Sequence, residues 1–194
     1  MKVLDMKARR MTTKQLILLV AGELFMDKGY QATSTREIAE KAGITQPNLY
    51  HHFRTKEDIY IAVLENLSGE VREALEQIVA SDAYSLEHTL QKVLDYLRAK
   101  HPVNFFIMSH DIAHEISSDN HQRLYKIWMA SYLSPLAHLF KKYVSEKTPF
   151  TPNELGRHFY STIAPFIQKD GGFYKEVSSE QVIHLFVYGI LDRE

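Results

Sequence analysis

The chain has 194 residues, of which 45% are hydrophobic, and a formal net charge of −1. This length and composition allow a sizeable core in one or two domains and argue against disorder. The absence of cysteine excludes disulfides, thiolate metal sites and a cysteine nucleophile. No apolar run reaches the roughly 18 residues that a membrane span needs, and no signal-peptide pattern follows the basic N-terminus. We therefore expect a soluble, cytoplasmic protein with no membrane partner.

Charge is unevenly distributed along the chain. Residues 1–60 carry ten Lys and Arg against seven Asp and Glu, whereas the remainder carries thirteen against seventeen. A basic front on an acidic body favours phosphate binding at one end of the molecule.

Apolar residues recur at three- and four-residue steps, which predicts an all-α chain of about nine helices. Capping residues and glycines delimit the first four, which run from Thr12 or Thr13 to about Lys28, from Ser34 to Gly43, from Thr45 onward, and from Thr55 to about Ala80. Capping-box patterns support the second and fourth starts, and Gly29 should stop the first helix. The core-facing residues expected on the first helix are Leu16, Leu19, Val20, Leu24 and Phe25.

Five further helices are predicted over 85–99, 102–117, 120–144, 152–168 and 179–191. Pro135 should kink the third of these, and Pro165 should bend or end the fourth. We expect a small N-terminal domain over 1–60, joined by the fourth helix of the chain to a larger helical domain over 61–194.

Residues 34–56 have the layout of a helix-turn-helix: a short helix, a glycine turn, a second short helix and the cap of a third. On the second short helix, Leu49 and Phe53 share the side that would pack inward. The N-terminal part of such a helix meets base edges in the major groove, where a glutamine can bond adenine through two hydrogen bonds. The outward residues are Thr45, Gln46, Pro47, Asn48, Tyr50 and His51.

The starts of the neighbouring helices fit a phosphate clamp. Thr35 and Arg36 open one helix and Lys56 opens another, and helix N-termini favour phosphate oxygens. A basic arm of Lys7, Arg9 and Arg10 precedes the first helix. The same pattern also fits helical hairpins that never touch DNA, with His51 as part of an ordinary surface pair.

The segment ELFMDKGYQATSTREIAEKAGITQPNLYHHFRTKEDI resembles the N-terminal signature of the TetR family of bacterial transcriptional repressors. The resemblance covers about residues 12–60. Its marks are Phe25, Gly29, Tyr30, Thr33, Ile38, Ala39, Ala42, Gly43, Leu49, Tyr50, His52, Phe53 and Lys56.

This resemblance implies phosphate contacts by Thr35, Tyr50 and Lys56. It also implies base or backbone contacts by Thr45, Gln46, Pro47 and His51, with His52 and Phe53 as structural support. Pro47 stands where the family often has a small residue; its ring adds an apolar surface that fits a thymine methyl group.

The family resemblance further implies a homodimer that binds a near-palindromic operator in double-stranded DNA and is released by a small-molecule inducer. The region from Leu67 onward would bind the ligand, and the last two helices would form a four-helix bundle with a partner. The apolar residues expected to be exposed there are Phe159, Ile163, Phe166, Val182, Leu185, Phe186 and Ile190. The alternative is that they pack inside one subunit.

Aromatic residues gather in the middle of the larger domain. The candidate ligand-binding residues are Phe105, Met108, Tyr125, Trp128 and Tyr132, with Phe106 beside them. They suit an apolar or aromatic small molecule, although aromatic residues at helical spacing are also typical of a plain core.

Three alternatives stay open. His110 and His114 have the spacing of a metal-binding pair, with Asp111, Glu115 or His121 as a possible third ligand. Control by a protein partner would need no small molecule, and a helical enzyme or structural protein would leave the motif vestigial. No nucleotide-binding, hydrolase or metalloprotease motif is present, so we expect neither an enzyme nor a bound cofactor or metal.

Overall fold

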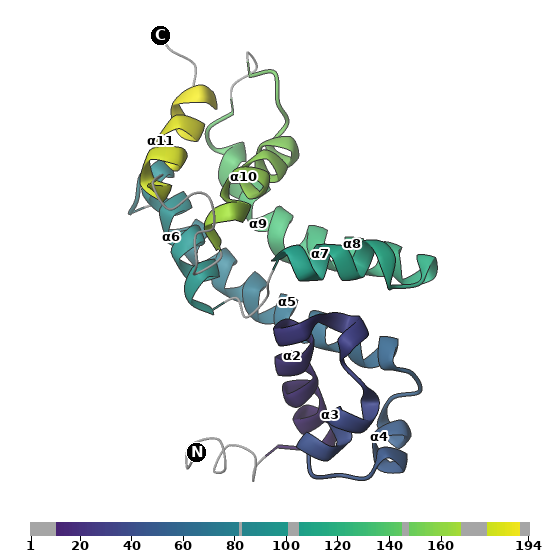
Figure 1. The fold of residues 1–194 in the computed structure, drawn as a ribbon. Helices are drawn as coiled ribbons and strands as arrows, with labels where there is room; N and C mark the ends of the chain where they lie inside the picture. The colour runs from purple at the N-terminus through teal and green to yellow at the C-terminus, as the bar shows by residue number, and fades with distance from the viewer. Residues whose placement is uncertain (1–10, 82, 101–104, 145–147, 168–177, 191–194) are drawn as a thin grey trace. The chain divides into compact units, whose positions relative to one another are not determined.

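The computed structural model describes residues 11–81, 83–100, 105–144, 148–167 and 178–190, where every regular element is a helix (Figure 1). The side chains of residues 100, 105–109 and 190 lie outside this description. The elements are α2 (Thr13–Ala32), α3 (Thr35–Lys41), α4 (Gln46–His52), α5 (Lys56–Ala80), α6 (Leu86–Lys100), α7 (Phe105–His114), α8 (Ser118–Trp128), η1 (Met129–Leu133), α9 (Ser134–Lys141), α10 (Pro152–Ile167) and α11 (Ser179–Ile190). Because α8, η1 and α9 follow one another without a gap, the described residues form nine helical stretches, and the all-α prediction is confirmed.

Caps and glycines fix the helix ends in the first part of the chain. Thr12 caps α2 in a capping box with Gln15, and Gly29 breaks the helical geometry with a φ of 86°. The predicted stop at Gly29 is therefore correct, although a helical turn continues to Ala32. Gly43, with a φ of 66°, makes the turn between α3 and α4.

The starts of α3, α4 and α5 also follow the prediction. Ser34 accepts a hydrogen bond from the Glu37 amide, and Thr45 accepts one from the Asn48 amide. Thr55 and Asp58 exchange two hydrogen bonds of 3.0 Å between side chain and backbone. These bonds satisfy amide groups that would otherwise lack partners in the first turn of each helix.

The core-facing side of α2 was predicted only in part. Val20, Leu24 and Phe25 are buried, but Leu19 is 38% exposed and Leu16 is half-buried. Ile17 is fully buried instead. The expectation for Leu19 was wrong because a nearly all-apolar run leaves the direction of the buried face undefined.

The backbone contacts divide the chain into two compact units, separated after Leu67 within α5 and after Leu124 within α8. We call the first the N-terminal unit: α2, α3, α4, α5 to Leu67, α7, and α8 to Leu124. The second, the C-terminal unit, holds the rest of α5 and α8 with α6, η1, α9, α10 and α11. The domain boundary near residue 60 stays a prediction; in sequence it falls inside α5.

Pro135 does not end its helix; a π-helical stretch precedes it instead. Proline lacks an N–H group and its ring crowds the carbonyl four residues earlier. The helix accommodates the proline through η1, where the Ser134 amide donates a hydrogen bond to the carbonyl of Met129, five residues earlier. Pro165 lies inside α10, which continues to Ile167.

The predicted dimer face of α10 was wrong for three residues. Phe159, Ile163 and Phe166 are at most 7% exposed, because they pack within the subunit. On α11, Leu185 is 72% exposed, and Val182 and Phe186 are half-buried. The side chain of Ile190 lies outside the described residues.

Among the described residues, none of the helices combines the length and apolar character required to cross a bilayer.

Candidate nucleic-acid interface

Helix α4 is anchored by one side and presents the other to solvent. Leu49 is fully buried and Phe53 is 6% exposed, as the sequence predicted. The outward residues named in the sequence are all exposed: Thr45, Gln46, Pro47, Asn48, Tyr50 and His51. This places a polar, solvent-facing helix tip on an apolar anchor, which is the arrangement of a recognition helix.

Thr35 links the start of α3 to two residues of α4. Gln46 Nε2 donates a hydrogen bond to Thr35 Oγ1 at 3.2 Å, and the hydroxyls of Thr35 and Tyr50 lie 3.0 Å apart. Thr35 itself is only 9% exposed, whereas Tyr50 is 45% exposed. Thr35 therefore orients Gln46 and Tyr50, a role that the sequence pattern did not indicate.

Lys56 is already engaged within the protein. Its Nζ donates to the carbonyl oxygens of Tyr30 at 2.9 Å and Thr33 at 3.1 Å, and lies 4.1 Å from the centroid of the Tyr30 ring. Burial lowers the pKa of its ammonium group, against the opposing effect of Glu115 and Asp111. Lys56 thus holds the end of α2 and the turn that follows it, and a phosphate contact through its ammonium stays a prediction.

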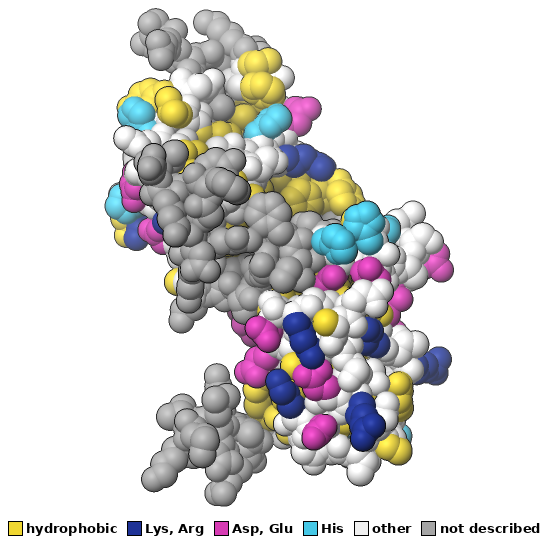
Figure 2. Space-filling view, viewed as in Figure 1, with side chains coloured by type: hydrophobic (Ala, Val, Ile, Leu, Met, Phe, Trp, Pro, Cys, Tyr) yellow, Lys and Arg dark blue, Asp and Glu magenta, His cyan; other side chains and the backbone are white. Residues whose placement is uncertain are grey.

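The remaining predicted cations are placed as follows. Arg36 is exposed at the start of α3. On the face of the N-terminal unit in view, Lys and Arg are interspersed with Asp and Glu (Figure 2). Lys7, Arg9 and Arg10 lie outside the described residues. On this face the described residues form no continuous basic patch (Figure 2).

A buried carboxylate on α7, named in the sequence analysis only as a possible metal ligand, joins this helix to α2 and α5 within the N-terminal unit. Asp111 is 5% exposed and accepts a hydrogen bond of 2.9 Å from the Tyr30 amide, just after the break at Gly29. The Tyr60 hydroxyl lies 3.5 Å from the same oxygen, and burial together with Asp111 raises the pKa of Tyr60.

The histidine pair on α7 is close but incomplete as a metal site. The rings of His110 and His114 lie 4.8 Å apart between centroids, and both residues are exposed. Asp111, one possible third ligand, bonds Tyr30 instead. The described part of the chain holds no group of three or more residues suited to a metal ion.

The candidate ligand-binding residues are divided between core and surface. Tyr132 is 4% exposed, and burial raises its pKa. Tyr125 and Trp128 pack against the Arg157 guanidinium, at 5.8 and 5.6 Å from their ring centroids. The Trp128 ring also lies 6.4 Å from that of Tyr160. The side chains of Phe105, Phe106 and Met108 lie outside the described residues.

Comparison with known sequences places the similarity in the N-terminal part of the chain. The family described as "Bacterial regulatory proteins, tetR family" matches residues 17–63. The HTH-type transcriptional activator FasR of Mycolicibacterium smegmatis is 46% identical over 63 residues, which are 30% of this chain and 29% of that protein. QacR of Staphylococcus aureus, an HTH-type transcriptional regulator, is 46% identical over 54 residues, 28% of this chain and 29% of QacR. The HTH-type transcriptional repressor KstR2 of Mycolicibacterium smegmatis is 32% identical over 83 residues, 43% and 40% of the two chains.

Solved structures extend the likeness of fold over most of the chain. A TetR transcriptional regulator from Legionella pneumophila matches with a TM-score of 0.75 over 93% of this chain and 98% of its own, at 20% identity. FadR from Bacillus subtilis, solved in complex with stearoyl-CoA, matches with a TM-score of 0.72 over 91% and 98%, also at 20% identity. The alignments with the three relatives named above span less than half of those proteins, so their detailed activities do not transfer directly. The helix-turn-helix geometry and these matches together show that the chain belongs to the TetR family of bacterial regulatory proteins.

Proposed function

We propose that this protein is a homodimeric transcriptional repressor that binds a near-palindromic operator through α4 and leaves it when a small molecule binds the C-terminal unit. The observation that carries the proposal is the exposed polar tip of α4, anchored by Leu49 and oriented by Thr35. A dimer would present two such tips to successive major grooves, about 34–36 Å apart.

Base reading falls mainly to Gln46. One N–H of the Gln46 side-chain amide donates to Thr35. The second N–H can then donate to adenine N7, and the carbonyl oxygen can accept from adenine N6. Thr45, Asn48 and His51 are exposed on the same helix and would contact neighbouring bases or phosphates. The ring of Pro47 would contact a thymine methyl group.

Phosphate contacts would come from the flanks of α4. When the Thr35 hydroxyl accepts from Gln46 and donates to the Tyr50 oxygen, the Tyr50 O–H is free to donate to a phosphate oxygen. Arg36 adds an exposed cation at the start of α3. Such contacts set the position of the protein on the duplex, while the bases confer specificity.

Helix α11 is the proposed dimerisation surface. Leu185 is 72% exposed and Tyr188 is 50% exposed, three residues apart on the same helix. An exposed apolar face of this kind suits a two-fold contact in which the same patch meets itself.

The ligand would contact the aromatic residues of the C-terminal unit. Tyr125 and Trp128 are partly exposed, and Tyr132 lies behind them on the same continuous helix. FadR from Bacillus subtilis shares this fold and was solved with stearoyl-CoA, which supports small-molecule control. Repression is the proposed direction because occupation of an operator blocks other proteins, although one relative is named an activator.

The DNA part is tested by selecting binding sites from a random duplex library and measuring affinity by fluorescence anisotropy. Replacing Gln46 with Ala should weaken binding to the selected site by about 1–3 kcal/mol and relax the preference at one position per half-site. Gln122, exposed on α8, provides the control Gln122→Ala. Unchanged affinity and preference in Gln46→Ala would contradict the assigned reading helix.

The dimer and its ligand are tested together by native mass spectrometry. The parent protein should appear as a dimer, and Leu185→Glu as a folded monomer, because a buried unpaired charge is costly. Leu19→Glu changes a leucine that is 38% exposed in the N-terminal unit and should stay dimeric. A discrete extra mass on the parent would reveal a bound small molecule. A monomeric parent protein would contradict the two-half-site mechanism.

A further inference from the structure

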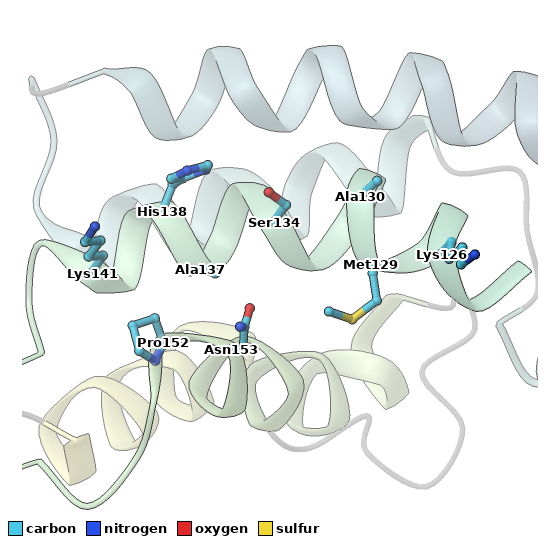
Figure 3. A pocket seen from close by; sticks show the side chains of 9 residues that line it. All are labelled: Lys126, Met129, Ala130, Ser134, Ala137, His138, Lys141, Pro152 and Asn153. Carbon is cyan, nitrogen blue, oxygen red and sulfur yellow. The ribbon is translucent and has the colours of Figure 1, made fainter. Parts of the chain in front are cut away.

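An open groove of about 580 Å³ lies in the C-terminal unit, between one face of the continuous helix α8–η1–α9 and the start of α10 (Figure 3). Its floor is small and mainly apolar, formed by the half-buried Met129, Ser134, Ala137 and Pro152. Tyr125, Trp128 and Tyr132 do not line it, so this groove is distinct from the aromatic site proposed above.

The rim of the groove is cationic. Lys126 lies toward one end, and His138 and Lys141 lie toward the other (Figure 3). Among the described residues, no carboxylate lines the groove, and none of these three side chains forms an ion pair. Glu154 lies close in sequence to the lining residues Pro152 and Asn153, but its carboxylate accepts hydrogen bonds from the amide and hydroxyl of Thr151. The groove thus combines a mainly apolar floor with two lysines and a histidine that form no ion pair with a described residue.

We propose that this groove binds a single-chain amphipathic anion, specifically a long-chain carboxylate. Its chain lies along Met129 and Ala137, and its carboxylate meets Lys141 and His138. Lys126 and Lys141 are fifteen residues apart on a nearly continuous helix, so the groove extends roughly 20 Å at about 1.5 Å per residue. That length suits an extended acyl chain rather than a compact anion. Met129 supplies a flexible, polarisable wall for such a chain.

The local helix geometry supports a binding role. Met129 belongs to η1, and π-helical turns occur frequently at functional sites. The Arg157 guanidinium contacts Met129 Sδ at 3.6 Å and lies 5.6 Å from the Trp128 ring centroid. Trp128 is the single tryptophan of the chain, so its fluorescence reports on this helix. The proposal does not depend on the DNA-binding proposal.

The first test titrates the purified full-length protein with laurate, octanoate and dodecanol below their aggregation concentrations, followed by Trp128 fluorescence and calorimetry. Laurate should bind and change the fluorescence. Octanoate should bind more weakly by about three- to fourfold for each buried methylene that it lacks. Dodecanol, with the same chain and no charge, should bind about tenfold more weakly than laurate. Absence of laurate binding by the parent protein would overturn the proposal.

Two variants locate the ligand. Ala137→Phe fills the floor and should weaken laurate and dodecanol alike by at least about tenfold. Lys141→Glu should weaken laurate by about tenfold and leave dodecanol unchanged, because only the carboxylate meets this side chain. Lys41→Glu makes the same charge change at an exposed position of α3 and should bind both ligands like the parent. Thermal unfolding by circular dichroism checks that each variant is folded.

The same variants separate the other possible occupants. Parental laurate binding in both Ala137→Phe and Lys141→Glu would place the chain elsewhere and overturn the proposal. Conversion of these variants to monomers, measured by light scattering, would identify the groove as a contact between copies and would also overturn it. Operator affinity without laurate should be parental in both variants, so a failure of the groove is distinguishable from a failure of the DNA-binding proposal.

Discussion

The two compact units differ in how far local sequence signals determine their surfaces. In the N-terminal unit, Thr12, Ser34, Thr45 and Thr55 each cap or open a helix where the sequence placed them. In the C-terminal unit, helix bounds were predicted nearly as well, but Phe159 belongs to the core rather than to a surface. The comparison teaches that capping is a short-range interaction, whereas burial depends on which distant helix covers a face.

The largest expected effect concerns the core of the C-terminal unit. Phe159 is fully buried, with the rings of Phe140 and Phe186 at 6.5 and 5.5 Å between centroids. Phe159→Ala should lower the free energy of unfolding by about 3–5 kcal/mol. Urea unfolding followed by circular dichroism measures this loss. Val182→Ala, a half-buried position on α11, is the control and should cost much less. A loss below about 1 kcal/mol would contradict the core role of Phe159.

The second prediction distinguishes a residue that supports the fold of the N-terminal unit, Lys56, from one that contacts phosphate, Arg36. Lys56→Ala removes hydrogen bonds to the Tyr30 and Thr33 carbonyls, so it should weaken operator binding about tenfold at every salt concentration. Arg36→Ala should instead lower the slope of log affinity against log salt by about 0.9, because a phosphate contact releases a counterion. Anisotropy titrations over a salt series measure both. A reduced slope in Lys56→Ala would show that its ammonium group contacts phosphate.

The smallest expected effect is a pH dependence within the N-terminal unit. Glu57 accepts hydrogen bonds from Ser117 and Asn120. Burial raises the pKa of Glu57, but these hydrogen bonds outweigh it and lower the pKa below its ordinary value of 4.5. The carboxylate therefore stabilises the fold above pH 4.5, and this contribution is lost as pH falls through the lowered pKa.

Thermal unfolding between pH 7 and pH 3 tests this dependence. Glu57→Gln should be less stable than the parent by about 1 kcal/mol at pH 7, and the difference should close toward pH 3. Glu23→Gln, at an exposed position of α2, should track the parent throughout. A difference that grows as the pH falls would reverse the assigned sign.

Much of the candidate DNA interface was predictable because one short segment contains most of it. Leu49 and Phe53 follow from helical periodicity, and the exposed side of α4 is then defined. The role of Thr35 was not predictable, because its hydrogen bonds depend on how α3 and α4 pack. The hydrogen bonds of Lys56 were not predictable for a related reason, since its partners are backbone carbonyls more than twenty residues earlier in the chain.

The sequence by itself determined the helical class, most helix ends and which side of α4 is exposed, because caps, glycines and 3.6-residue periodicity act over a few residues. Only the tertiary structure decided that Ile17 rather than Leu19 is buried. The packing of Asp111 against the Tyr30 amide and the cationic groove beside η1 likewise emerged only there. These features join residues far apart in the chain, and the energy that places them comes from packing and desolvation between helices.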